Sequence, residues 1–533
     1  MKNKFTRTLA TALFAVSLLP FSSCIKDLDQ TPSYELTTDN VYKDPARVKE
    51  VLARLYATLA VSGQTGPAGQ PDISGIDEGF SNYIRQYWMA QEITTDEAIL
   101  GWADGNLPDY NKLTWNANNE FVRAMYDRIF YQISLCNEFV RQTTDAKLGD
   151  YGYSSAEQTN VKQYRAEARF LRALSYYHAL DMFGNVPFAT ETFTVGKDKP
   201  QRIERAALFN YIESELKAIE GDLAAPRTNE FGRADQAAAW TLLTKLYLNS
   251  NVYNGSNHNT DAITYANKVL NAGYTLTPNY ANLFKADNSS VAASEIIFPV
   301  RFDGVHTKSY GGMTFIIHAA VGGSMSATDF GIDGGWGGTR TKKNLVNLFP
   351  NAATGTSPDK RAMFYTAGQT LEINDLPTFT DGYAITKFKN VSSTNAPGSN
   401  PTFPDTDFPM FRLADVQLMY AEAVVRGGTG GSTTTALGYI NALRQRAYGN
   451  TSGNITAADL NLNLILDERG RELYWEGHRR TDLIRFGKYT TGYNWPFKGG
   501  VRVGADVPAT RALFPIPTTD LTANPNLQQN AGY

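Results

Sequence analysis

The chain has 533 residues, a formal net charge of −3 at pH 7 and 12% aromatic residues. It contains no run of lysines and arginines, which excludes a nucleic-acid or anionic-lipid partner, because both need clustered positive charge. Its two cysteines, Cys24 and Cys136, are too few for a disulfide scaffold.

Residues 1–23 have the order of a secretory signal. Lys2, Lys4 and Arg7 form a positive start, a short apolar stretch follows, and small residues precede Cys24. The apolar stretch is shorter than the about 20 residues that span a bilayer. The arrangement resembles the lipobox of bacterial lipoproteins, so we expect Cys24 to become the lipidated N-terminus. Ordinary secretion with an incidental cysteine is the alternative.

A polar segment without periodicity follows the cysteine, and residues 24–35 are therefore expected to be the lipidated N-terminus and its tether. Ten extended residues reach about 30 Å. Lys26, Asp27 and Asp29 resemble the surface-export signal of Bacteroidetes lipoproteins. Residues 36–533 would then form a single body.

Helical patterns dominate this body. Asp44-Pro45 is typical of an N-cap and first helical residue, and apolar residues from 48 to 59 fall on one helical face. A long helix is predicted over residues 161–183, before Gly184. Further helices are predicted at 126–140, 206–223, 234–249, 260–272, 411–426, 436–447 and 464–486. The fold class is therefore mainly α, and the spacing of small and large residues resembles tetratricopeptide pairs.

Cys136 lies within the apolar-periodic stretch at 126–140. A buried, reduced thiol is therefore expected there, with a reactive thiol as the alternative.

The character of the chain changes over about residues 287–410. Glycine, serine, threonine and asparagine dominate, and only short strand-like runs such as 295–301 and 313–317 remain. Long irregular segments in compact proteins often carry function, and the aromatic residues scattered through this one indicate that it is ordered.

No strong catalytic motif is present, and the five histidines are isolated in sequence. A glycosidase needs only two carboxylates beside a sugar bond, and the chain has 53 Asp and Glu residues. A glycan-cleaving enzyme therefore stays an alternative. Asp405 and Asp407 lie in a proline-flanked loop that would suit a structural calcium ion, with Asp287 as a third ligand. The alternative is a solvated or helix-capping aspartate pair. No cofactor is otherwise expected.

Three aromatic residues lie on glycine-rich loops: Trp102, Tyr310 and Trp336. Flanking glycines leave a ring accessible, and a flat ring suits the apolar face of a pyranose while polar neighbours bond the hydroxyls. The alternative is that each ring folds inward as a loop anchor. The three together favour a sugar-binding platform.

Several segments, taken in order, resemble the SusD/RagB family of outer-membrane lipoproteins. They are residues 165–173, 183–188, 468–487 (ERGRELYWEGHRRTDLIRFG), 514–517 and 524–533. The resemblance covers essentially the whole mature chain and implies a SusD-like fold. The charged, periodic segments themselves read as elements of helix packing and capping.

Within that family the resemblance is strongest to starch binding, through segments 77–79, 231–235, 303–305, 310–312 and 403–407. It implies an arc of Trp102, Tyr310 and Trp336 against a helical α-glucan, with hydroxyl contacts from the residues Arg85, Asp77 and Asn106. Leu100 replaces a tryptophan of that pattern, which would remove a supporting contact. The loop with Asp405 and Asp407 resembles a calcium-bearing loop.

The resemblance further implies a non-enzymatic, surface-exposed lipoprotein of the outer membrane. Such a protein would deliver starch or malto-oligosaccharides to a SusC-like TonB-dependent transporter. Another glycan, such as levan or a host polysaccharide, is the alternative within the same class, and a peptide-capturing role is a third.

Overall fold

The computed structural model of the chain describes residues 38–194 and 196–533. The signal of residues 1–23, the lipidation site Cys24 and the tether to residue 35 lie outside the described residues. The mainly α fold is confirmed, with 46% helix and only short strands.

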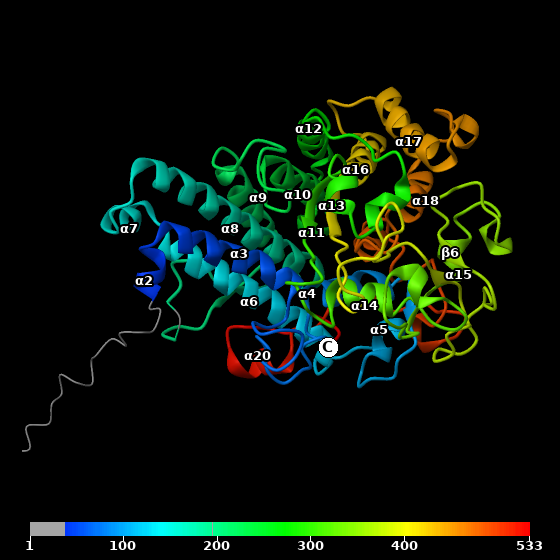
Figure 1. Cartoon of the computed structure of the whole chain (residues 1–533), viewed down its shortest axis with the longest axis horizontal. Coiled ribbons are helices and arrows are strands. Elements are labelled where there is room, and N and C mark those ends of the chain that lie inside the picture. Colours follow the sequence, from blue (N-terminus) through cyan, green and yellow to red (C-terminus); the bar gives the residue numbers. More distant parts are fainter. Residues whose placement is uncertain (1–37, 195) are drawn as a thin grey trace, which may run out of the picture.

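Long helices packed side by side form the scaffold in the first half of the chain (Figure 1). The helices of this half are α2 (Thr38–Tyr42), α3 (Pro45–Ala60), α4 (Tyr83–Trp88), the π-helix η2 (Met89–Ile93), α5 (Pro108–Lys112), α6 (Glu120–Gln142), α7 (Asp145–Asp150), α8 (Ser155–Met182), α9 (Arg205–Ile219), α10 (Gln236–Leu248), α11 (Ser250–Asn254) and α12 (Asn259–Leu270). As predicted, Asp44 caps α3 by accepting a hydrogen bond from the N–H of Ala46 at 3.0 Å. Helix α8 begins earlier than residue 161, because Ser154 and Glu157 form a capping box.

The scaffold continues with helices from the second half, so that α10 packs on α12, α12 on α16, and α16 on α17 and α18. The helices of this half are α13 (Asn288–Val291), α14 (Gly312–His318), α15 (Lys343–Val346), α16 (Leu413–Val425), α17 (Thr433–Tyr448), α18 (Leu462–Leu473), α19 (Arg479–Arg485) and α20 (Thr518–Ala523). The helices predicted at 126–140, 206–223, 234–249, 260–272 and 436–447 correspond to α6, α9, α10, α12 and α17. Cys136 is free and fully buried in α6, and burial raises its pKa to about 12.

The described strands form four two-stranded antiparallel sheets. The pairs are β1 (Ala98–Leu100) with β5 (Thr339–Thr341), β2 (Val186–Phe188) with β3 (Gln201–Ile203), β4 (Ile296–Val300) with β8 (Phe408–Arg412), and β6 (Phe364–Tyr365) with β7 (Ala384–Ile385). Short 3₁₀ turns complete the irregular parts: η3 (Tyr280–Phe284), η4 (Ala327–Phe330), η5 (Ala352–Thr354), η6 (Thr451–Gly453), η7 (Lys498–Gly500) and η8 (Ala509–Ala512). The strand predicted at 295–301 is confirmed as β4.

One predicted element is wrong and the start of another is shifted by two residues, in both cases where the residues are buried on all sides. The strand predicted at 313–317 is helix α14, every residue of which is buried, so no polar positions reveal the helical period. The helix predicted from residue 411 begins at Leu413 instead. Phe411 and Arg412 belong to β8, where they pair with β4.

The helix predicted over 464–486 is broken into α18 and α19. Trp475 and Gly477 have left-handed backbone angles, with φ of 65° and 81°. The carboxylate of Glu92 accepts hydrogen bonds from the N–H groups of Gly477 at 2.5 Å and His478 at 3.2 Å. Glu97 accepts one from the N–H of Trp475 at 3.2 Å. Distant carboxylates therefore replace the helical hydrogen bonds at this turn.

Buried ion pairs join the irregular segment to α18. The carboxylate of Glu472 forms ion pairs with Arg361 at 3.0 Å, with Arg412 at 2.7 Å and also with Arg446. Glu468 forms a further ion pair with Arg361, at 2.7 Å. These side chains are buried, so their charges are compensated within the protein rather than by solvent.

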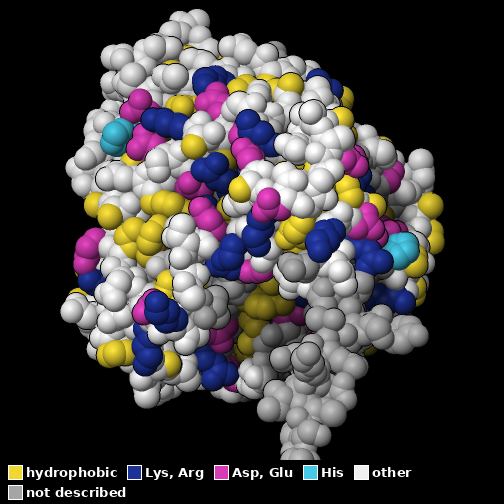
Figure 2. All heavy atoms as spheres, turned by 90° about the vertical axis from the view of Figure 1, so that its left-hand side faces the viewer, with side chains coloured by type: hydrophobic (Ala, Val, Ile, Leu, Met, Phe, Trp, Pro, Cys, Tyr) yellow, Lys and Arg dark blue, Asp and Glu magenta, His cyan; other side chains and the backbone are white. Residues whose placement is uncertain are grey.

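No helix in residues 38–194 or 196–533 is long and apolar enough to cross a membrane. Figure 2 shows the end of the molecule that carries α2 and α7, where basic and acidic side chains are interspersed. Among the residues that the structure describes, the charges seen at this end are therefore of mixed sign.

The pair Glu92 and Glu97 generates a prediction about pH. Burial raises the pKa of Glu92 to about 7 and the pKa of Glu97 above its usual range, and the two side chains share a hydrogen bond. A raised carboxyl pKa means stability that is complete at low pH and is lost as pH rises from about 4.5 to about 7. The variant Glu92→Gln removes this loss. Its free energy of unfolding should rise relative to wild type between about pH 4.5 and about pH 7, by up to about 1.4 kcal/mol per pH unit, and the difference should stay constant above that range.

Urea unfolding at several pH values measures this difference. Glu372→Gln, at an exposed carboxylate paired with Lys343, is the control and should show a flat difference. A flat difference for Glu92→Gln would contradict the prediction.

Candidate functional site

The small sheet of β1 and β5 brings two of the predicted rings together. Leu100 pairs with Thr339, and the N–H of Gly101 donates to the carbonyl of Gly338 at 2.9 Å. Trp102 follows β1 and Trp336 precedes β5, so the antiparallel register places them at the same end. Their ring centroids lie 6.3 Å apart.

Glycine is required beneath Trp102. A methyl group at Gly338 would lie 2.5 Å from the Trp102 ring, closer than any side chain allows. Both tryptophans remain partly exposed, whereas Leu100 is buried in β1. Leu100 is thus a core position, and the effect of the missing tryptophan on affinity stays a prediction.

His318 supports Trp336 from below. The two rings stack with centroids 4.8 Å apart and an interplanar angle of 29°. The buried imidazole places Nδ1 2.7 Å from the carbonyl of Gly334 and Nε2 3.1 Å from the carbonyl of Thr402. Burial lowers the pKa of His318, and the neutral ring donates one of these two hydrogen bonds. The histidine therefore fixes the glycine loop that carries Trp336.

Tyr310 lies at the other end of α14 from His318. It is 42% exposed, and its ring lies 5.4 Å from that of Phe403. Its backbone and Cβ approach Gly79 so closely that a methyl group there would lie 2.9 Å from the Cβ of Tyr310. Since α14 has seven residues, it separates Tyr310 from the support of Trp336 by about 10 Å.

Arg85 lies between these parts of the site. The Arg85 guanidinium is 4.2 Å from the ring of Phe80, 4.2 Å from Phe315 and 5.8 Å from Trp102. The residue is 3% exposed, and neither Nε nor Nη2 has a hydrogen-bond partner among the described residues.

Two acidic residues act on this guanidinium. Burial lowers the pKa of Arg85 to about 9, while the charges of Asp77 and Asp104 oppose the shift. Asp77 is exposed and accepts a hydrogen bond from the N–H of Phe80 at 3.1 Å. The site therefore holds a cation with unused donor capacity beside accessible rings.

Asn106 is tied to the start of α6. Its Oδ1 accepts a hydrogen bond from the N–H of Glu120 at 3.1 Å, and its carbonyl accepts one from Asn119 at 3.0 Å. Its contact with a ligand stays a prediction. Sequence reasoning missed Phe80, Phe315 and His318, because buried apolar and isolated polar residues carry no distinguishing local pattern.

The three carboxylates proposed for calcium are not brought together. Asp287 accepts hydrogen bonds from Ser393, at 2.7 Å from its N–H and 2.6 Å from its hydroxyl. Asp405 accepts from the N–H of Gly304 at 2.8 Å. Asp407 accepts from the N–H of Phe302 at 2.8 Å and pairs with Arg301 at 3.1 Å.

Each carboxylate thus accepts hydrogen bonds from a segment that is distant in sequence, 106 residues away for Asp287, 101 for Asp405 and 105 for Asp407. In the described part of the chain no group of three or more His, Cys, Asp or Glu residues could hold a metal ion. The calcium prediction is corrected accordingly.

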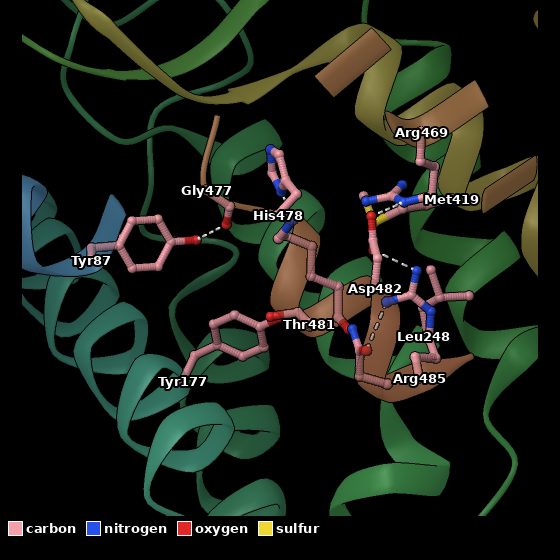
Figure 3. A pocket seen from close by; sticks show the side chains of 12 residues that line it. Tyr87, Tyr177, Leu248, Met419, Arg469, Gly477, His478, Thr481, Asp482 and Arg485 are labelled. Carbon is pink, nitrogen blue, oxygen red and sulfur yellow. Dashed lines mark hydrogen bonds and ion pairs between the residues drawn. The ribbon is translucent and has the colours of Figure 1, made fainter. Parts of the chain in front are cut away.

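The charged segment 468–487, which we call the signature segment, lies away from the rings. Figure 3 shows its residues around a cavity of about 10 Å³, enough for one water molecule. Arg469 bonds Asp482 at 2.7 Å, Arg485 bonds Asp482 at 2.7 Å, and the hydroxyl of Tyr87 donates to the carbonyl of Gly477 at 2.7 Å. The segment holds the fold together, as expected from the sequence.

Comparison with known proteins identifies the family. The profile of the SusD family matches residues 360–533. The chain is 36% identical to the starch-binding protein SusD of Bacteroides thetaiotaomicron, over 100% of both chains. It is 23% identical to SusD-like protein P2 of Formosa agariphila, over 98% of this chain and 99% of that protein. The chain therefore belongs to the SusD family, whose binding proteins are not catalytic.

Solved structures agree on the fold. A SusD superfamily protein from Bacteroides thetaiotaomicron superposes with a TM-score of 0.70 at 20% identity, covering 91% of this chain and 99% of that one. Surface glycan-binding protein A from the same species, in complex with laminarihexaose, gives a TM-score of 0.68 at 19% identity, with the same coverage. The expected SusD-like architecture is confirmed.

His318 provides a test of the site's construction. His318→Ala removes a buried ring, its stacking on Trp336 and its hydrogen bonds, and should lower the free energy of unfolding by about 2–4 kcal/mol. Urea denaturation measures the change. His306→Ala, at an exposed histidine, is the control and should cost less than about 0.5 kcal/mol. Equal effects of the two substitutions would refute the supporting role.

Proposed function

We propose that this protein is a surface-exposed, lipid-anchored binding protein for starch and related α-glucan oligosaccharides. The observation that carries the proposal is the pair of neighbouring rings Trp102 and Trp336, with Arg85, a buried cation with unused donors, 5.8 Å from the Trp102 ring. Full-length identity of 36% to a starch-binding protein supports the choice of ligand.

The protein would bind its ligand without making or breaking a covalent bond. The faces of Trp102, Trp336 and Tyr310 stack on successive glucose units, and Arg85, Asp77 and Asn106 bond hydroxyl groups. Rings held in place by glycine loops and by His318 need little ordering when a ligand arrives. A fixed arc favours a ligand that is already curved, such as an amylose helix or a cyclic glucan, over flat cellulose.

Another glycan is the second candidate within the same class. A laminarin-binding SusD-like protein has the same fold, with a TM-score of 0.66 at 22% identity. Laminarin therefore belongs in a binding panel beside starch, levan and host polysaccharides. Tighter binding of any of these than of starch would transfer the proposal to that glycan.

We also propose that the protein is anchored in the outer membrane through Cys24. It would deliver its ligand to a SusC-like TonB-dependent transporter. The order of charged, apolar and small residues before Cys24 supports the anchor. Binding proteins of this family act at the cell surface, which supports the location.

Substitution of the rings tests the binding site. Trp102→Ala, Trp336→Ala and Tyr310→Ala should each weaken retention in starch-containing gels, because a central aromatic contact contributes about 2 kcal/mol, more than tenfold in Kd. Affinity electrophoresis measures the retention. Trp240→Ala, at a half-buried tryptophan of α10, is the control and should migrate like wild type. Unchanged retention of all three ring variants would rule out the site.

The anchor has a matched test, since the chain holds only two cysteines. Cys24→Ser should abolish incorporation of labelled palmitate and release the protein from the membrane fraction. Cys136→Ser alters a buried thiol and should keep the label. Persistent labelling of Cys24→Ser would show that the lipid is attached elsewhere or that the signal is of another kind.

A further inference from the structure

A fourth partly exposed ring, Phe379, lies next to the tryptophans. It rests on backbone without side chains. A methyl group at Gly337, the residue after Trp336, would lie 3.7 Å from the ring, and one at Gly322 would lie 3.0 Å from it. Phe379 therefore has the same kind of glycine support as Trp102.

The loop that carries Phe379 is fixed from within. The carboxylate of Asp381 accepts hydrogen bonds from the N–H groups of Asn374 and Asp375, both at 2.9 Å. The N–H of Asp381 donates to the carbonyl of Thr378 at 3.0 Å. These bonds close the turn 374–381, so the position of Phe379 does not depend on a ligand.

Arg340 ties this turn to the sheet that positions the tryptophans. Its guanidinium donates to the carbonyls of Leu376 at 2.8 Å, Asp381 at 2.9 Å and Gly338 at 3.2 Å. It also lies 6.0 Å from the centroid of the Phe379 ring. Since Gly338 supports Trp102, a single buried side chain of β5 links the two ring-bearing loops.

Polar groups suited to hydroxyls accompany the ring. Asp375 and Thr378 are exposed, and the Thr378 hydroxyl donates to Asp375 at 2.7 Å. A carboxylate also lies near Tyr310, because a methyl group at Gly79 would lie 2.9 Å from the Cβ of Tyr310 and 3.2 Å from Oδ1 of Asp77. The same ligand chemistry, a pyranose with its hydroxyls, is expected at both places.

We propose that Phe379 forms an additional sugar subsite that extends the arc beyond Trp336 and makes the protein selective for longer glucans. This inference rests on the proposed function, because it assumes that the tryptophans bind a glycan. In this proposal the three glucose units of a short ligand are taken up by Trp102, Trp336 and Tyr310, and only a longer ligand also reaches Phe379.

The test compares maltotriose with maltoheptaose by isothermal titration calorimetry of the purified protein. Phe379→Ala should raise the Kd for maltoheptaose about three- to tenfold, the range of one aromatic stacking contact, and leave the Kd for maltotriose unchanged. Phe379→Leu keeps apolar packing on the glycines but lacks a ring, and should behave like the alanine variant. Phe379→Tyr should restore wild-type affinity.

Tyr439→Ala, at a half-buried ring of α17, is the matched control and should change neither Kd. An unchanged maltoheptaose Kd for Phe379→Ala and Phe379→Leu would overturn the subsite, as would equal weakening of both ligands. Trp102→Ala separates this failure from that of the proposed function. If Trp102→Ala weakens both ligands while the Phe379 variants do not, only the subsite is overturned; if it weakens neither, the proposed function fails and the subsite with it.

Discussion

The structure depends on the buried ion pairs around Glu472 in α18. This carboxylate forms ion pairs with Arg361 of the irregular segment, with Arg412 of β8 and with Arg446 of α17. Removing charges from water costs several kcal/mol per ion, so such a network adds little net stability. A single missing partner leaves a buried charge without compensation, however. The network therefore selects one placement of the irregular segment on the helical scaffold.

The signature segment is connected to Trp102 through the backbone. Glu92 and Glu97 hold the turn between α18 and α19, and the chain that carries them continues directly into β1. Trp102 stands at the end of that strand, and the register with β5 brings it to Trp336. The signature segment is thus tied to the backbone that leads into β1 and on to Trp102.

Local signals were sufficient for much of the fold, and they are the basis on which the three rings are proposed. The cap at Asp44 and the glycines around Trp336 act within a few residues, so their consequences follow from the sequence. The break between α18 and α19 did not follow from it, because carboxylates almost 400 residues away in sequence hold the turn at Gly477. His318 and Phe379 are likewise recognisable only once the chain has placed each beside a glycine loop.

The unbonded N–H groups of Arg85 are the strongest reason to expect a polar ligand at this site. Other buried arginines, such as Arg412 and Arg340, bond carboxylates or carbonyls, whereas Nε and Nη2 of Arg85 have no hydrogen-bond partner among the described residues. Two aromatic faces at 4.2 Å stabilise a cation without using its N–H groups. Leaving those groups unbonded costs free energy in the unliganded protein. Under the proposed function, a hydroxyl-rich ligand that reaches these groups would recover this cost, and Arg85 would then favour polar ligands over apolar ones of the same shape.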